Sequence, residues 1–145
     1  MFKDNSDACI KAIRDAQEAA LRAIGELMYA AVYPLIPKDT TALANSLDFK
    51  IDLSDMSVTI GVNTEYAIYV EFGTGVFAEN GQGRQGGWLY PDKENGEMIF
   101  TVGMHPQPYL RPAYKDNVEN IKQIIEENLK KYVGNDFKVS VKKVM

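Results

Sequence analysis

The sequence predicts an α+β fold in which an antiparallel sheet of hairpins packs against a long N-terminal and a long C-terminal helix. Three observations lead to this prediction. Apolar residues recur at three- and four-residue steps near both ends of the chain, as they do on one face of a helix. Apolar and polar residues alternate in several short segments between them, and residues typical of turns separate these segments. The length of 145 residues is that of one domain, residues 1–145.

The first helix is expected from about residue 4 to residue 33. Asn5 or Ser6 could cap its start, and Pro34 and Pro37 end it, because proline cannot continue a helix interior. Gly25 in its middle suggests close approach of a neighbouring backbone. The apolar stripe consists of Ile10, Ile13, Ala20, Leu21, Ile24, Leu27, Met28 and Ala31.

A short helical turn through Ala44, capped by Asp39 or Thr40, leads into the first predicted hairpin. Residues 47–53 and residues from 57 onward ("SVTIGV") both alternate, and "SDMS" between them supplies the turn. The next stretch, "YAIYVEFGTG" (66–75), fits a short helix better than a strand. Asn63 or Thr64 could cap that helix, and Gly73 could end it in a left-handed conformation.

The remainder of the chain contains a glycine-rich segment, a second hairpin and the second long helix. We expect a flexible loop near 76–87 and a hairpin near 88–102, because Asn95-Gly96 is a strong hairpin signal. Pro112 is expected as the first residue of the helix, and 136–144 ("DFKVSVKKV") as a final strand. The apolar stripe of this helix consists of Tyr114, Val118, Ile121, Ile125, Leu129 and Tyr132.

Composition excludes some classes of protein. The net charge of −4 argues against a general nucleic-acid binder, although Lys138, Lys142 and Lys143 leave room for a local basic spot. Cys9 is the single cysteine, which excludes an internal disulfide and fits a reducing compartment, where a free thiol is commonly buried. No apolar run approaches the roughly 20 residues of a membrane span. The start "MFKDNSDACIKA" lacks the apolar core of a signal peptide, so we expect a cytoplasmic protein.

We find no pattern that predicts a catalytic, metal or cofactor site. The single histidine, His105, lies in a segment that we interpret as structural, and a catalytic triad or a zinc site would need further partners around it. "GQGRQGG" lacks both the Gly-Lys-Ser/Thr ending of a phosphate loop and the helix that should follow it. We therefore expect no enzyme activity and no cofactor.

Three motifs in order do carry a resemblance: "DTTALANS" (39–46), "YAIYVEFGTG" (66–75) and "QPYLRPAY" (107–114). Together they resemble the HK97-gp10-like family of tailed-phage tail-completion or head–tail joining proteins. The chain departs from the family pattern at Thr41, where glycine is common, and at Tyr109, where phenylalanine is usual. The matching residues are Thr40, Leu43 and Ser46; Tyr66, Ala67, Val70, Glu71, Phe72, Gly73 and Thr74; and Pro108, Leu110, Arg111, Pro112 and Ala113.

The resemblance spans roughly residues 37–132 and implies a structural component of the virion neck, made in the cytoplasm of a host bacterium. Such a protein would join or complete the tail by forming a homo-oligomeric ring and by docking on other neck and tail proteins. It could still be a monomer in solution. An acidic net charge also suits a ring through which DNA passes, since a basic channel would retain the polymer. The alternatives are a small hydrolase-like enzyme centred on His105 and a monomeric protein-interaction module.

Three hypotheses concern particular side chains. Glu71 and Arg111 each lie in an apolar stretch, and we expect them to pair, because an unpaired buried charge is costly. Tyr66, Tyr69 and Phe72 are expected in the core or, failing that, at a subunit interface. In the glycine-rich segment, we expect a docking loop that orders when a partner binds; its candidate contacts are Asn80, Gln82, Arg84 and Trp88.

Overall fold

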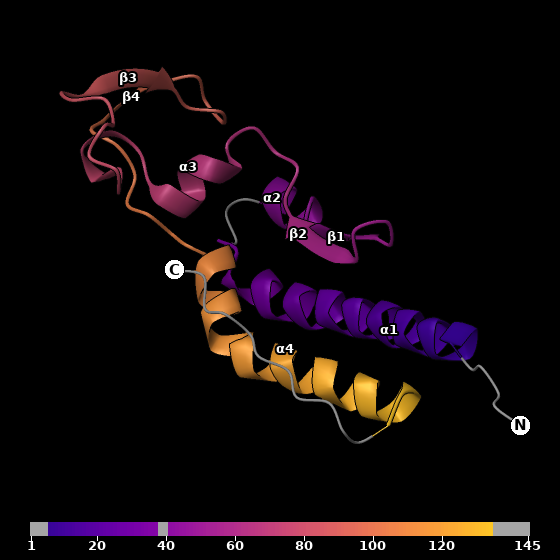
Figure 1. The fold of residues 1–145 in the computed structure, drawn as a ribbon. Helices are drawn as coiled ribbons and strands as arrows, with labels where there is room; N and C mark the ends of the chain where they lie inside the picture. Colours follow the sequence, from indigo (N-terminus) through magenta and orange to yellow (C-terminus); the bar gives the residue numbers. More distant parts are fainter. Residues whose placement is uncertain (1–5, 38–40, 135–145) are drawn as a thin grey trace, which may run out of the picture.

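Two long antiparallel helices form the base of the computed structural model, which describes residues 6–37 and 41–134. α1 (Ser6–Val32) and α4 (Leu110–Tyr132) lie side by side (Figure 1). Both long helices are therefore confirmed. The core between them contains Ile24, Met28 and Val32 from α1 and Ala113 and Ile121 from α4.

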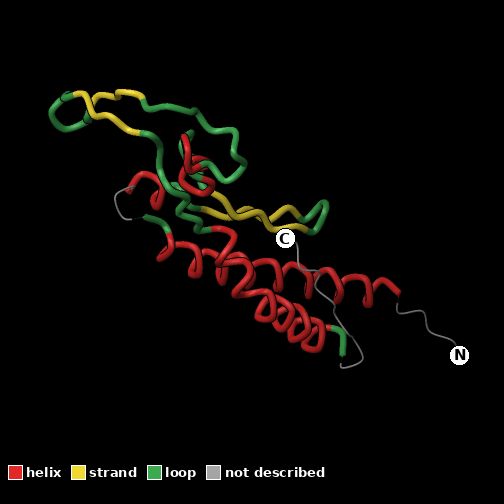
Figure 2. Tube along the Cα trace, turned by 90° about the vertical axis from the view of Figure 1, so that its left-hand side faces the viewer, coloured by secondary structure: helices red, strands yellow, loops and turns green. Residues whose placement is uncertain are grey.

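The first turns of α1 depart from the predicted stripe. Ile10 and Ile13 are exposed, at 50% and 36%. The reason is visible in Figures 1 and 2, where the N-terminal end of α1 extends beyond both α4 and the nearest hairpin. Cys9, in the same region, is also exposed, so its expected burial is wrong.

The first hairpin packs on α1. β1 (Asp48–Asp52) and β2 (Ser57–Gly61) pair antiparallel, with Phe49 opposite Ile60 and Ile51 opposite Val58. Gly25 faces this hairpin: a Cβ on Gly25 would overlap the ring of Phe49. The close approach predicted at Gly25 is thus made by a side chain of β1 and not by backbone.

A short helix links α1 to this hairpin. After the 3₁₀ turn η1 (Tyr33–Leu35), which contains Pro34, the helix α2 covers Thr41–Asn45. Leu43 is fully buried, and the Ser46 hydroxyl donates to the Leu43 carbonyl at 2.8 Å while it accepts the Asn63 N–H at 3.1 Å. The first motif therefore ties the end of α2 to the segment that follows β2.

A smaller layer lies beside the first hairpin, above the start of α4 in Figure 1. It contains α3 (Ala67–Phe72), the 3₁₀ turn η2 (Gly75–Phe77) and the hairpin of β3 (Trp88–Pro91) and β4 (Met98–Thr101). The two hairpins form two separate two-stranded sheets. Gly73 has a φ of 80°, as predicted for the end of α3, but Tyr66 is the N-cap, so neither Asn63 nor Thr64 caps this helix.

α4 starts slightly earlier than the sequence predicts. Its first residue is Leu110, with Tyr109 as the N-cap, so Pro112 is the third helical residue and not the first. Some predictions concern residues outside the described ranges: the strand at 136–144 with Lys138, Lys142 and Lys143, the caps Asn5, Asp39 and Thr40, and the motif residue Thr40. In the described part of the chain, none of the helices has the length and apolarity of a membrane span.

The contact between Gly25 and Phe49 predicts whether a Gly25→Ala substitution stabilises or destabilises the protein. In an ordinary exposed helix, Gly→Ala stabilises by about 1 kcal/mol, but at position 25 the methyl group must displace the Phe49 ring. We expect Gly25→Ala to destabilise by about 1–3 kcal/mol, the usual cost of overpacking, as measured by urea denaturation.

The matched control is Gly61→Ala, because a Cβ at Gly61 meets nothing within 4 Å. In the double variant with Phe49→Leu, the cost of Gly25→Ala should shrink, since the smaller side chain vacates the position. A higher melting temperature for Gly25→Ala alone would contradict this account.

Candidate docking site

The carboxylate of Glu71, at the end of α3, caps the start of α4. Glu71 is buried, with 3% of its surface exposed. Its Oε2 accepts the backbone N–H of Tyr109 at 2.8 Å and of Leu110 at 3.2 Å, and its Oε1 accepts the N–H of Arg111 at 3.2 Å. A carboxylate at a helix N-terminus is stabilised both by these amides and by the helix dipole.

This cap satisfies every free donor at the helix start. The first four backbone N–H groups of a helix have no partner within it. Here three of them, from Tyr109 to Arg111, donate to Glu71, and the fourth position is Pro112, which has no N–H. The sequence "EFG" at 71–73 and "YLRPA" at 109–113 thus form one structural unit, although they are far apart in the chain.

Arg111 extends the cap into an ion-pair network. Its Nε donates to Glu71 Oε1 at 3.0 Å and its Nη2 to the Glu71 backbone carbonyl at 3.0 Å. The same guanidinium makes two bonds to the carboxylate of Glu79, at 2.8 and 3.0 Å, and lies 4.5 Å from the centre of the Phe72 ring. The predicted pair of Glu71 and Arg111 is confirmed, but the carboxylate that binds the Arg111 guanidinium in a bidentate way is that of Glu79.

The ionisation of these groups follows from their contacts. Burial by itself raises the pKa of Glu71, but the hydrogen bonds from the Tyr109, Leu110 and Arg111 donors outweigh it and lower the pKa. The bonds from Arg111 likewise lower the pKa of Glu79. Burial and the neighbouring Glu71 carboxylate raise the pKa of the Tyr109 hydroxyl to about 12. Glu71 is therefore an anion at neutral pH, and Tyr109 is a neutral donor.

The segments around the cap are also joined through their backbones. Tyr109 is buried, and its hydroxyl donates to the Ala67 carbonyl at 3.1 Å. Residues 70–79 exchange hydrogen bonds with residues 102–107, including Thr74 N–H to the Met104 carbonyl at 2.9 Å and Gln107 N–H to the Val70 carbonyl at 2.8 Å. A Cβ on Gly75 would overlap the Val102 carbonyl. The glycines in "FGTG" permit this close backbone packing.

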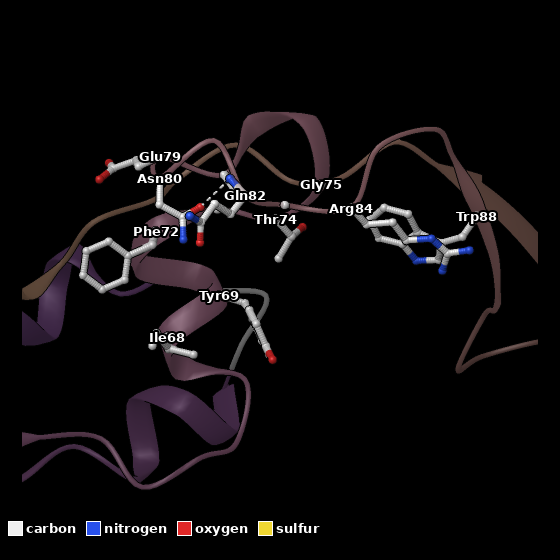
Figure 3. Close-up of a pocket in the computed structure, with 13 residues that line it drawn as sticks. Ile68, Tyr69, Phe72, Thr74, Gly75, Glu79, Asn80, Gln82, Arg84 and Trp88 are labelled. Atoms are coloured by element: carbon white, nitrogen blue, oxygen red, sulfur yellow. Dashed lines mark hydrogen bonds between the residues drawn. The ribbon is translucent and has the colours of Figure 1, made fainter.

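An apolar groove lies between α3 and the glycine-rich segment. Its volume is about 610 Å³. In Figure 3, Tyr69 lies between α3 and the pair formed by Arg84 and Trp88, and Asn80 and Gln82 lie beyond the end of α3. The Arg84 guanidinium is 5.3 Å from the centre of the Trp88 ring. The lining residues are Ile68, Tyr69, Phe72, Gly73, Thr74, Gly75, Ala78, Glu79, Asn80, Gln82, Gly83, Arg84 and Trp88.

The groove brings together two groups of residues that the sequence analysis kept apart. Tyr69, Phe72, Gly73 and Thr74 from the second motif line it, and so do all four candidate docking residues, Asn80, Gln82, Arg84 and Trp88. Glu71, Tyr109, Leu110 and Arg111 form the cap described above. The remaining motif residues lie next to it in the chain: Tyr66 is the N-cap of α3, Pro108 precedes α4 and Pro112 is in its first turn.

The expected burial of the three aromatic residues holds for one of them. Tyr66 packs against the core, but Tyr69 and Phe72 are 56% and 42% exposed, so placing them in the core was wrong. The inward side of α3 is taken by Val70 and Glu71, both buried, and a six-residue helix cannot bury its opposite side as well. Ile68 and Glu79 also line the groove, although no sequence pattern singles them out.

His105 lies outside the groove. It is exposed and stacks on Phe77 with ring centres 3.7 Å apart. Within residues 6–37 and 41–134, no group of three or more His, Cys, Asp or Glu side chains is placed to hold a metal ion.

The sequence also matches a known protein family over part of its length. The family model described as "Bacteriophage HK97-gp10, putative tail-component" matches residues 2–73. Residues 2–73 are thus similar to this HK97-gp10-like family of tail components. The match covers about half of the chain, from α1 to the end of α3, and so includes Glu71 but not its partner Arg111. No curated protein and no solved structure shows significant similarity to this chain.

Glu71 links the stability of the protein to pH. Its pKa is lower in the folded protein than its reference value of 4.5, so its stabilising effect is complete above about pH 4.5 and is lost as the pH falls through the folded pKa. We expect Glu71→Gln to destabilise the protein by about 2–4 kcal/mol at pH 7. The free energy of unfolding of this variant should also fall less between pH 7 and pH 3 than that of the wild type. Urea denaturation at pH 7 and pH 3 measures both effects.

Glu119→Gln is the control, because Glu119 is an exposed carboxylate on the same helix α4. It should change the free energy of unfolding by less than about 0.5 kcal/mol. Equal stability of Glu71→Gln and wild type at pH 7 would show that the cap is dispensable.

Proposed function

We propose that this protein is a structural component of a tailed-phage or prophage virion neck. It joins or completes the tail at the head–tail interface, where identical subunits assemble into a ring and dock on other neck and tail proteins. The family description as a phage tail component supports the coarser part of this proposal. The same description supports a location in the virion, and the protein would be made in the host cytoplasm.

One structural observation carries the docking part: the second motif forms a rigid joint on one side of α3 and an exposed apolar groove on the other. The joint consists of the Glu71 cap and the Arg111 network. It fixes the position of Tyr69 and Phe72 at the groove. An apolar surface held in place before binding loses little entropy when a partner covers it, which favours docking.

The two rival functions lack such support. A hydrolase centred on His105 would need a concave pocket with an acid beside the imidazole, whereas His105 stacks on Phe77 at the surface. A monomeric interaction module could use the same groove. Unlike a neck protein, such a module would not be part of a virion. An experiment on phage particles must therefore distinguish the two functions.

The decisive experiment removes the protein from the phage. An amber codon early in the gene should yield, in a non-suppressing host, DNA-filled heads beside detached tails, as counted by electron microscopy. Heads and tails should remain separate because the proposed ring is what links them.

A suppressing host supplies the control, since it restores the full-length chain and should restore joined particles. Joined, infectious particles in the non-suppressing host would refute the neck assignment, and intact unjoined tails of normal length would argue for a joining role over a role in tail-tube assembly.

A further inference from the structure

The β3–β4 hairpin has an apolar outer face that the described residues leave largely exposed, although the Phe100 ring lies against Gly87. Paired residues on neighbouring strands share a face, and successive pairs alternate. Leu89 pairs with Phe100 and Pro91 with Met98, so these four share one face. Leu89, Phe100 and Met98 are 59%, 64% and 59% exposed. We call this set the outer hairpin face.

The hairpin is poorly supported by the rest of the protein. Its two strands pack mainly on each other, and an isolated two-stranded hairpin is only marginally stable in water. The opposite face begins with Trp88, which lines the groove of its own chain. The outer hairpin face is therefore the face of the hairpin opposite to the one that lines the groove of the same chain.

The groove and the hairpin carry opposite charges. Of the two charged residues that line the groove, Glu79 is neutralised by Arg111, whereas Arg84 stacks on Trp88 and pairs with no carboxylate among residues 6–37 and 41–134. The turn between β3 and β4, "DKENGE" (92–97), has three carboxylates and one lysine. That lysine, Lys93, faces its own chain beside Tyr66 and Tyr69. An apolar groove with a free cation thus matches an apolar hairpin with an acidic turn.

We propose that the groove receives the outer hairpin face of a second copy of this chain, with Arg84 of the groove facing Glu94 and Glu97 of the incoming turn. The contact joins two different surfaces, so each subunit still offers one free groove and one free hairpin. Contacts of this type close into rings when the rotation between subunits permits. This inference rests on the proposed function, because it names the surfaces by which the ring would form.

A charge exchange tests the pairing. Self-association is measured by sedimentation equilibrium up to millimolar concentration. Arg84→Glu should weaken it at least tenfold, and so should the double change Glu94→Lys with Glu97→Lys, because each places like charges together. The chain with all three changes should associate within about threefold of wild type, since the attraction is restored with its signs reversed. Arg14→Glu, an exposed site on α1, has the same charge change and should have no effect.

A disulfide trap tests the geometry. In a Cys9→Ser background, one tagged chain carries Ile68→Cys in the groove wall and another carries Leu89→Cys on the outer hairpin face. Mixed under mild oxidation, they should give a disulfide-linked heterodimer in preference to either homodimer. A chain with Ile10→Cys in place of Ile68→Cys is the control and should not cross-link. All of the changed residues are exposed, and circular dichroism checks that each variant folds.

The outcomes separate this inference from the proposed function. If wild type associates but the charge variants associate equally well and no heterodimer is trapped, the ring uses other surfaces and only this inference is overturned. If wild type stays monomeric at millimolar concentration and no heterodimer is trapped, this inference is overturned as well, whereas the place of the protein in the neck is still decided by the amber phage.

Discussion

A carboxylate at the end of one helix satisfies the backbone amides at the start of another, and the arrangement of the smaller layer depends on this interaction. Without Glu71, the first N–H groups of α4 would lose their acceptor in a buried place, and without those groups a buried carboxylate would lose its partners. Either loss is costly, because buried polar groups must be hydrogen-bonded. The two motifs therefore stabilise each other, and α3 is held at one distance from the core helix α4.

The same interaction decides what α3 exposes. The helix has six residues, and the side that carries Val70 and Glu71 is used for the core and the cap. Its other side must then carry Ile68, Tyr69 and Phe72 outward. Arg111 stacks on Phe72 and binds Glu79, so a wall of the groove and the start of the glycine-rich segment are fixed together. A rigid exposed apolar surface is costly for an isolated chain and useful for one that is meant to be covered.

Periodicity in the sequence was enough to locate the helices and hairpins, and charge in an apolar context was enough to pair Glu71 with Arg111. Local signals failed where a distant residue took over their task. Asn63 and Thr64 are good caps by type, but Tyr66 is the N-cap of α3, and the side-chain cap in this region is the one that Glu71 supplies to α4. Pro112 was predicted at the first helical position, whereas the remote carboxylate lets the helix start two residues earlier. Glu79 could not be predicted, because its glycine-rich surroundings indicate a flexible loop, and Tyr69 and Phe72 were placed in a core that a short helix cannot offer on both sides.

The glycines of "EFGTG" show why composition misleads here. Glycine near a helix end suggests either flexibility or a cradle for an anion, and both depend on open space around the backbone. In this protein the space is filled: Gly75 and Gly103 lie where any side chain would overlap the backbone of the other segment. Glycine is needed because residues 73–75 contact residues 102–104, the segment that leads into α4. This contact fixes the position of the groove relative to α4. A partner that docks in the groove therefore contacts a surface whose geometry is set by the core of the protein.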